Sequence, residues 1–248
     1  MLFDNLRQRW IGVVLTLVAC VATVWLWLNG DLGLYVHPRY FAFTVIAAAC
    51  GIVLVVASFV VRVPADDATD GGRARRAWRR GLSVAVVVAS VFGIGALIVL
   101  PPATLTSATA DQRSVNSGTV VGSGAQQAAG DTADYGVKEW ATALRQSTDL
   151  QGIAGKPATL TGFISADPDD PDNVFFITRF FVTCCAADAQ PVGVPVYQPD
   201  WKSSLTLDDW VEVTGAFDLN PSVKSRQPMV ILPQQVSPVD EPSDPYVY

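Results

Sequence analysis

Three long apolar runs constrain this chain more than any other feature of its sequence. They cover residues 11–28, 41–61 and 82–100, and none contains Asp, Glu, Lys or Arg. At a rise of about 1.5 Å per residue, a helix of each length is about long enough to cross 30 Å of hydrocarbon. We therefore expect residues 1–100 to form a transmembrane domain of three helices. Buried helices of a soluble protein are the alternative, but such helices normally show a polar face or shorter apolar runs.

The aromatic residues near the ends of these runs agree with membrane interfaces. Trp and Tyr concentrate where hydrocarbon meets headgroups, because their rings are apolar while their tips are polar. In this chain the aromatic side chains near the expected interfaces are Trp10, Trp25, Trp27, Tyr35 and Tyr40.

The arginines set the expected orientation. The segment between the second and third runs, 62–80, contains six Arg, whereas the segment between the first and second contains Arg39 alone. Basic loops stay in the cytoplasm. We therefore expect a multi-pass plasma-membrane protein with a cytoplasmic N-terminus and an extracytoplasmic chain after residue 100.

Two targeting alternatives concern the first run. A cleavable signal peptide would be followed by a site with small residues, but "WLWLNGDLG" follows here. "LVAC", which ends at Cys20, looks like a lipoprotein box, yet the apolar run continues beyond it. We expect Cys20 and Cys50 to be ordinary small residues within membrane helices.

The second half of the chain reads as a linker followed by a β domain. Residues 101–134 are rich in Ala, Ser, Thr and Gly and lack apolar periodicity, which predicts a flexible linker. The segment "GVKEWATALRQ" then places four residues on one helical face: Val137, Trp140, Ala141 and Leu144. We expect residues 135–248 to form an extracytoplasmic domain that begins with this short helix.

Five strand-like segments follow, each β-branched, aromatic or alternating in pattern. They are "PATLTGFISAD", "VFFITRFFVT", "QPVGVPVY", "DWVEVTGAF" and "PMVILPQQVSPV". Five strands with a glycine in "LTGFI" and again in "VEVTGAF" predict a small all-β barrel of OB type. A β-sandwich is the alternative, because strand number alone does not fix closure. The expected fold class is an α+β membrane protein with three N-terminal transmembrane helices and an OB-like barrel.

Charge and motifs exclude several classes of function. Residues 101–248 contain eight basic against eighteen acidic residues, so we expect no nucleic-acid binding. The chain has no phosphate-binding glycine loop, nucleophile elbow or HExxH motif. Its single histidine, His37, lies outside the β domain, which leaves no Ser/His or Cys/His pair there. We expect no enzyme activity.

The adjacent pair Cys184–Cys185, at the end of the second strand-like segment, is the main candidate site. The pair has four interpretations: core packing of one cysteine, binding of a soft metal or metalloid, a vicinal disulfide or thiol-exchange site, and pairing with another chain. Asp188 could join the two thiolates as a third ligand. His37, in an outer loop, shares their expected compartment and could complete the set. Both thiols can converge only where the strand has ended, since successive strand residues face opposite ways.

Two further groups of polar residues need an explanation. Arg179 lies in the middle of a strand between aromatic residues, where an unpaired charge is costly. We expect Asp188 or Asp218 to pair with it, in a structural role rather than in substrate contact. The acidic segment "DPDDPDN" lacks the spacing of a calcium-binding loop, so a solvated turn is expected.

Four sequence segments together resemble the YcgQ-like family of bacterial membrane proteins. They are "GDLGLYVHPRYF" between two apolar runs, "LTGFI", "RFFVTCCAADAQPVGVPV" and "WVEVTGAF". Members of this family are regarded as the second subunit of a two-component permease. The resemblance therefore implies a multi-spanning permease as partner, within the lipid bilayer.

Taken together, these features predict an accessory membrane subunit whose extracytoplasmic β domain captures or gates a solute, such as a soft metal or metalloid. A thiol-redox protein that uses the paired cysteines is one alternative. A purely structural anchor for the permease is the other.

The predicted orientation can be tested in intact cells. Because the six arginines hold segment 62–80 inside, a membrane-impermeant protease or thiol reagent should reach the region 126–248 without lysis. Protection of that region until the cells are lysed would reverse the orientation.

Overall fold

The computed structural model describes residues 2–60, 104–117, 132, 134–147 and 150–248. The chain divides into two compact units, Met1–Ala103 and Thr104–Tyr248. The third predicted run, 82–100, and the arginine-rich segment 62–80 lie outside the described residues.

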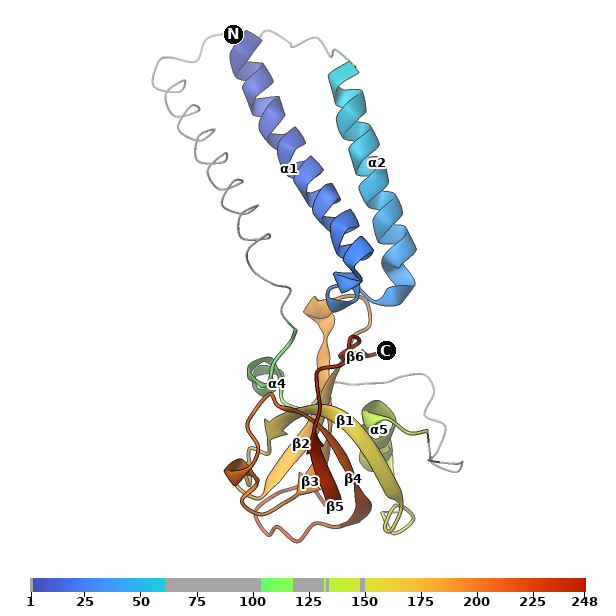
Figure 1. Cartoon of the computed structure of the whole chain (residues 1–248), viewed down its shortest axis with the longest axis vertical. Coiled ribbons are helices and arrows are strands. Elements are labelled where there is room, and N and C mark those ends of the chain that lie inside the picture. The colour runs from blue at the N-terminus through green and yellow to red at the C-terminus, as the bar shows by residue number, and fades with distance from the viewer. Residues whose placement is uncertain (1, 61–103, 118–131, 133, 148–149) are drawn as a thin grey trace. The chain divides into compact units, whose positions relative to one another are not determined.

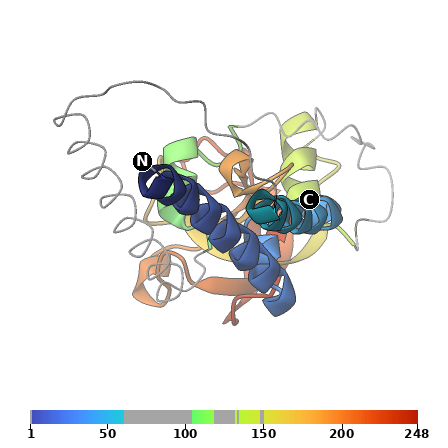
Figure 2. The ribbon, with the colours of Figure 1, turned by 90° about the horizontal axis from the view of Figure 1, so that it is seen from above.

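The first unit is a pair of long helices. α1 spans Leu2–Asn29 and α2 spans Phe41–Val60, joined by two short 3-10 turns, η1 (Asp31–Leu34) and η2 (Pro38–Tyr40). The two helices run side by side (Figure 1), and they remain adjacent when seen from above (Figure 2). A Cβ atom at Gly51 would lie only 2.8 Å from the Cys20 sulfur, so glycine allows the close approach of α1 and α2.

One helix among the described residues is long and apolar enough to cross a membrane. The segment Pro38–Val55 has a mean hydropathy of 1.8, and α1 contributes a shorter apolar stretch, Leu15–Asn29. The described residues therefore contain one or two candidate spans; the three predicted spans are not confirmed, and the third run lies outside the described residues. Several large apolar side chains of α2 are exposed within the chain: Phe43, Ile46, Val53 and Leu54.

The second unit is a β domain with two helices against it. Its strands are β1 (Pro157–Ala166), β2 (Val174–Phe181), β3 (Gln190–Tyr197), β4 (Trp210–Leu219), β5 (Met229–Pro238) and β6 (Tyr246–Val247); its helices are α4 (Ser107–Arg113) and α5 (Val137–Gln146). The five predicted strands and the predicted helix α5 are confirmed. Two residues are too few to show any alternation, and β6 was therefore missed. In the segment 198–209, between β3 and β4, a single 3-10 turn forms, η4 (Trp201–Ser203).

The strands form one six-stranded sheet, in which β1 has antiparallel partners on both sides. β1 pairs with β2 and with β4, β4 pairs with β5, and β2 pairs with β3. The parallel contact between β3 and β5 rests on one pair of residues, Val196 and Ile231, and links the two arms of the sheet. β6 lies parallel to β2. Because the β3–β5 contact is narrow, the sheet is not clearly a closed barrel, and the OB-type barrel stays a prediction.

Glycines let β1 serve two partners. Residues 157–163 pair with β4 and residues 163–166 pair with β2, so β1 changes partner next to Gly162. A Cβ atom at Gly162 would lie 2.7 Å from the Thr178 carbonyl oxygen. In β4 the register shifts between Thr214 and Gly215, where a Cβ atom would lie 2.4 Å from the Leu232 carbonyl oxygen. The glycines of "LTGFI" and "VEVTGAF" thus permit close backbone approach at the two bends.

Helix α5 supplies the centre of the main core. Trp140 is fully buried, and its ring centroid lies 4.5 Å from that of Phe217 in β4. Inward-facing strand residues complete this core, among them Ile164, Ile177, Val194, Val213 and Ile231. The spacing of Val137, Trp140 and Ala141 in the sequence explains why one face of α5 is buried there.

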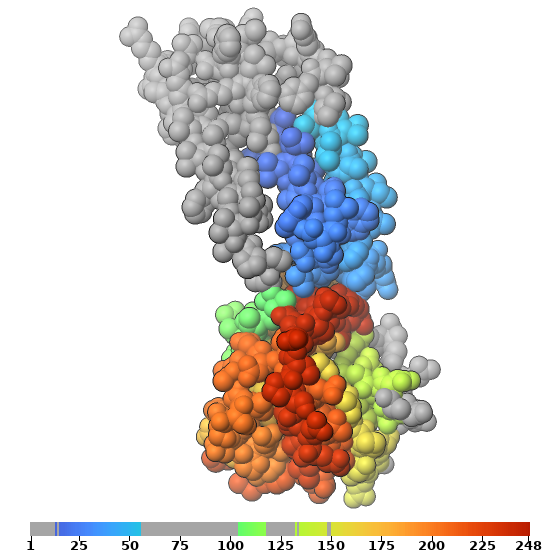
Figure 3. Space-filling view, viewed as in Figure 1, coloured from blue at the N-terminus to red at the C-terminus, as the bar shows by residue number. Residues whose placement is uncertain are grey.

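A second, smaller core lies beneath α4. Ala110 of α4 is fully buried against Phe163 and Phe180, with Val182, Ala189 and Tyr246 around them. β6 contributes to this core through Tyr246. In the space-filling view the C-terminal stretch, in red, covers a strip of the visible face of the β domain (Figure 3).

The segment 104–117 differs from the flexible linker predicted for 101–134. The Asp208 carboxylate accepts hydrogen bonds from Ser107 N (2.6 Å) and Ser107 Oγ (3.0 Å). The Asn116 side chain donates to Gly193 O (2.8 Å) and accepts from Gly193 N (2.9 Å). These contacts join residues far apart in sequence, so small-residue composition gave no sign of them. Residues 118–131 of the predicted linker lie outside the described residues.

The close approach at Gly215 yields a stability prediction. Gly215→Ala places a methyl group against the Leu232 carbonyl, a backbone atom that cannot rotate away. We expect a loss of about 1–3 kcal/mol in the free energy of unfolding. Chemical denaturation of the detergent-purified protein, followed by circular dichroism, measures it. Glu212→Ala, an exposed position on the same strand, is the control and should change stability little. Equal stability of the two variants would contradict this account of the bend.

Candidate metal centre

The cysteine pair lies in the connection between β2 and β3. β2 ends at Phe181 and β3 begins at Gln190, and these two residues are paired, so residues 182–189 form the end of a hairpin. The N–H of Val182 donates to the carbonyl of Val247, after which the chain leaves the sheet. In Figure 1 this hairpin end, in light orange, extends beyond the other strands. The 3-10 turn η3 (Ala186–Asp188) then returns the chain to β3.

One carboxylate organises this connection. Oδ2 of Asp188 accepts from Cys184 N at 2.8 Å, and Oδ1 accepts from Thr183 N at 3.2 Å and Cys185 N at 3.4 Å. Burial by itself would raise the pKa of the Asp188 carboxyl, but hydrogen bonds from the Cys184 thiol and from the three amides lower it below its usual value. The carboxylate is therefore charged at neutral pH.

The two thiols lie side by side. Cys184 Sγ donates to Cys185 Sγ across 3.6 Å, and both cysteines are free. Cys184 is exposed and Cys185 half-buried, so neither is a core residue. The two sulfurs and a carboxylate oxygen of Asp188 lie within 4.8 Å of one another. Within the described part of the chain, this is the one group of three such residues close enough to hold a metal ion.

The Cys184 thiol holds its proton strongly. A hydrogen bond to the Asp188 carboxylate, together with one to Cys185, raises the pKa of Cys184 to about 12. A thiol in this state is a poor nucleophile at neutral pH, because the thiolate is the reactive form. A metal ion nevertheless displaces such a proton, because a coordinated thiol is bound as the thiolate.

Arg113, the last residue of helix α4, binds the β2–β3 connection through hydrogen bonds to its backbone. The Arg113 guanidinium donates to Ala189 O and, at 3.3 Å, to Ala187 O, the carbonyls on either side of Asp188. Sequence reasoning missed Arg113 because it lies in a low-complexity segment more than seventy residues before its partners. No local pattern signals such a contact.

The fourth predicted ligand, His37, lies in the other unit. It precedes η2, and its Nδ1 accepts a hydrogen bond from Arg39 N at 3.0 Å. Its ring also makes an edge contact with Tyr40. Its participation in the Cys184 site stays a prediction.

The predicted partners of Arg179 are wrong. Its guanidinium donates to the carbonyl of Asp244 at 3.3 Å and lies over the Trp210 ring at 5.3 Å. The oxygens of Asp188 accept from the cysteine connection, and Asp218 Oδ1 accepts from Leu219 N. The segment before β6 supplies the Arg179 partner instead, and it could not be placed from the sequence. Burial lowers the pKa of Arg179, and its Nε has no hydrogen-bond partner.

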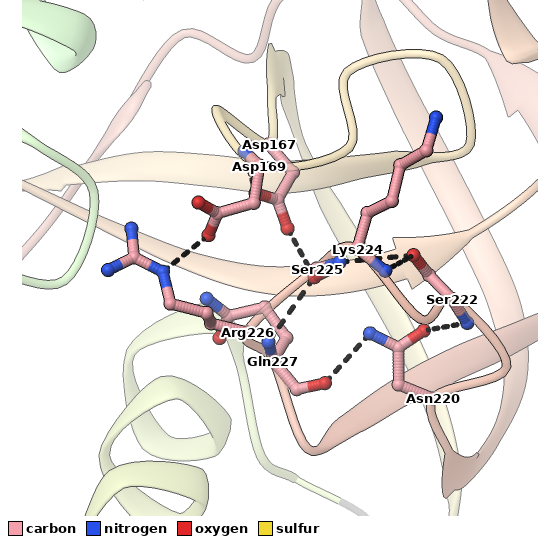
Figure 4. A network of polar contacts seen from close by, with 8 residues as sticks. All are labelled: Asp167, Asp169, Asn220, Ser222, Lys224, Ser225, Arg226 and Gln227. Carbon is pink, nitrogen blue, oxygen red and sulfur yellow. Dashed lines mark hydrogen bonds and ion pairs between the residues drawn. The ribbon is translucent and has the colours of Figure 1, made fainter.

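The acidic segment "DPDDPDN" is not the solvated turn that the sequence predicts, because its carboxylates bind the loop between β4 and β5. We call this set of contacts between the two loops the brace. Asp167 and Asp170 are buried, and their carboxylates accept from Ser225 Oγ and Ser222 Oγ, both at 2.6 Å. Arg226 Nε donates to Asp169 at 2.7 Å. Figure 4 shows this loop and the β4–β5 loop facing each other through the contacts of Asp167 with Ser225 and of Asp169 with Arg226. The carboxylates are thus occupied by donors of the chain itself.

An open depression of about 560 Å³ lies beside this brace. Its walls come from α4 and the segment after it, from β1 and β2, and from the two braced loops, and they include Asp111, Val115, Asp167, Asp169, Phe176 and Arg226. Asp167 and Asp169 already have protein partners. The cysteine connection therefore stays the stronger candidate site.

Comparison with family models gives a match in the β domain. Residues 134–248 match the DUF1980 C-terminal domain, an uncharacterised family. No curated protein matches the chain. Among solved structures, an OBody named AM2EP06, bound to hen egg-white lysozyme, is 16% identical, with 36% of this chain and 84% of that chain covered and a TM-score of 0.24. The domain match does not decide the YcgQ-like resemblance, which stays a prediction.

The raised pKa of Cys184 yields a reactivity prediction. Asp188→Asn removes the carboxylate that stabilises the thiol proton, so the pKa should fall toward the usual thiol value of about 8.5. We expect Cys184 to be alkylated by iodoacetamide about tenfold faster or more at pH 8.5. Peptide mass mapping assigns the modified cysteine, and Asp218→Asn, exposed on β4, is the matched control. An unchanged rate in Asp188→Asn would show that the carboxylate does not control the thiol.

Proposed function

We propose that this protein is an accessory membrane subunit of a multi-spanning permease, and that its extracytoplasmic β domain captures or gates a solute at Cys184, Cys185 and Asp188. One observation carries the proposal. The two thiols and the carboxylate lie within 4.8 Å of one another on an exposed hairpin connection. We propose a soft metal or metalloid as the solute, because thiolates select such ions over hard cations.

The surroundings of the three ligands support binding rather than accidental proximity. Three backbone amides fix the Asp188 carboxylate, as outer hydrogen bonds fix the ligands of metal sites. Arg113 holds the same connection from α4. The site is therefore shaped before an ion arrives, which reduces the entropy lost on binding.

The membrane part of the proposal includes three spans, with the domain outside. α2 is long and apolar enough to cross, and its exposed apolar side chains favour a lipid or protein environment. The run 82–100 supplies the third span by its sequence. Uncharged spans offer no ion pathway of their own. For this reason we assign the pathway to a partner permease within the lipid bilayer.

An OB-like barrel is part of this proposal. The pairings lead from β1 through β2, β3, β5 and β4 back to β1, which favours a closed arrangement over a sandwich. Small barrels and their loops often carry ligand sites at strand ends. The β2–β3 connection occupies such a position.

A thiol-redox protein is the second candidate. Adjacent free cysteines favour it, but the Cys184 pKa of about 12 leaves little thiolate for exchange at neutral pH. The chain also has no C-x-x-C motif. A purely structural anchor, the third candidate, would leave both thiols dispensable.

Native purification tests the proposal. The full chain, isolated in a gentle detergent from its own membrane, should retain the permease and carry a soft metal or metalloid in elemental analysis. Cys184→Ser and Cys185→Ser should each lower the bound ion by about tenfold or more and abolish partner-dependent uptake, because each removes one ligand. Cys50→Ser, a cysteine of α2 outside the site, is the control.

The outcomes separate the candidates. A chain that purifies without any permease counts against an accessory role. Folded cysteine variants with normal ion content and normal uptake would favour the structural anchor. A disulfide between Cys184 and Cys185 in the purified chain, with no ion, would favour the redox candidate.

A further inference from the structure

We propose that the Cys184–Cys185–Asp188 site takes a tetrahedral divalent cation of the zinc class, with three ligands from this chain and the fourth position open for exchange. This inference rests on the proposed function and names its solute class. Its geometry separates a zinc-like ion from monovalent copper or silver.

The spacing of the two sulfurs carries the inference. The Sγ atoms are 3.6 Å apart. An ion bound to both at a metal–sulfur distance of about 2.3 Å would subtend an S–metal–S angle of about 103°. The tetrahedral angle is about 109°, so the two thiols already match the shell that zinc prefers.

A linear site needs a different spacing. With two thiolates on opposite sides of an ion, the same bond length would require the sulfurs about 4.6 Å apart. The adjacent cysteines would have to open by about 1 Å to reach it from 3.6 Å. Monovalent copper and silver, which favour two-coordinate sulfur sites, therefore fit this geometry less well.

The third ligand favours the same class. A carboxylate oxygen is a hard donor, and a set of two sulfurs and one oxygen suits a borderline divalent ion better than a soft monovalent one. In a tetrahedral shell sulfur and oxygen lie about 3.6 Å apart. Since the three ligand atoms lie within 4.8 Å of one another, closing the shell requires at most about 1.2 Å of movement. Rotation of the exposed Cys184 side chain can supply part of it.

An open fourth position suits transfer. Structural zinc sites are closed by four protein ligands, whereas sites with three protein ligands keep one place for water or substrate. Among the described residues, the group has three members. A water molecule or a ligand of the permease would fill the fourth place, so the ion can be passed on without prior loss of all its protein ligands.

Binding is a proton exchange without redox chemistry. Each thiol loses its proton as a metal–sulfur bond forms, and the ionised Asp188 adds a metal–oxygen bond, so two protons leave per ion. The bound site then carries a net charge of −1. The charged groups that face it are Asp188 itself and, from α4, the Arg113 guanidinium on Ala187 O and Ala189 O. Affinity therefore rises with pH.

Cobalt(II) is the probe, because its visible spectrum reports coordination geometry and thiolate ligation together. The full chain in lipid nanodiscs is titrated with Co(II) and then with Zn(II). We expect intense tetrahedral bands with sulfur-to-cobalt charge transfer, displacement by Zn(II), and two protons released per ion. Cys184→Ser and Cys185→Ser should abolish the charge-transfer bands or halve them, and Asp188→Asn should weaken affinity about tenfold or more. Cys50→Ser and Asp218→Asn are matched controls and should match the wild type.

Cys184→Ala, with circular dichroism of every variant, separates loss of ligation from loss of folding. Spectra of octahedral Co(II), or spectra unchanged by the cysteine substitutions, would overturn the tetrahedral site. Binding of Ag(I) or arsenite without Co(II) or Zn(II) would also overturn it, while capture of a soft solute would still stand. Tight Zn(II) binding by a chain that retains no permease would support this inference and count against the proposed accessory function.

Discussion

The β domain depends on a single strand that has two partners. β1 pairs with β4 along residues 157–163 and with β2 along 163–166, so it joins both arms of the sheet. Gly162 permits this because glycine has no side chain, and the Cβ atom of any other residue there would clash with the Thr178 carbonyl. β1 also contributes Leu160 and Ile164 to the core around Trp140, and it pairs with β2, whose hairpin with β3 carries the cysteine connection. The candidate site thus stands on a hairpin whose root is fixed by backbone pairing.

The hydrogen bonds within the candidate site join residues close in sequence, whereas the sheet that carries the site is built by pairing distant strands. Asp188 lies within five residues of all three amides that it accepts from, so the connection can shape itself once the hairpin has formed. The same carboxylate raises the pKa of the neighbouring Cys184 thiol. Asp188 therefore keeps the Cys184 thiol protonated and places a charged carboxylate beside it. The metal site that we propose is compatible with this arrangement, because a coordinated thiol loses its proton, whereas thiol exchange needs a free thiolate.

Helix α4 gives the site a connection to the rest of the chain. Arg113 and Asn116 tie the segment 104–117 to the cysteine connection and to β3, and this segment directly follows the apolar run 82–100 in the sequence. The brace between the β1–β2 and β4–β5 loops fixes other connections of the same sheet. The domain is thus held by polar contacts at several of its loops, and at the cysteine connection the Cys184 thiol stays exposed.

The sequence by itself determined the features that repeat over short distances. Strand alternation located β1 to β5, helical spacing located α5, and the adjacent cysteines marked the site. Tertiary structure decided which distant residues meet. It placed α4 in a segment that composition describes as a linker, paired Arg179 with the segment before β6, and set Arg113 on the carbonyls beside Asp188. The reason is physical: periodicity reports which face of an element is buried, whereas a polar contact across seventy residues exists only after the chain has closed around its core.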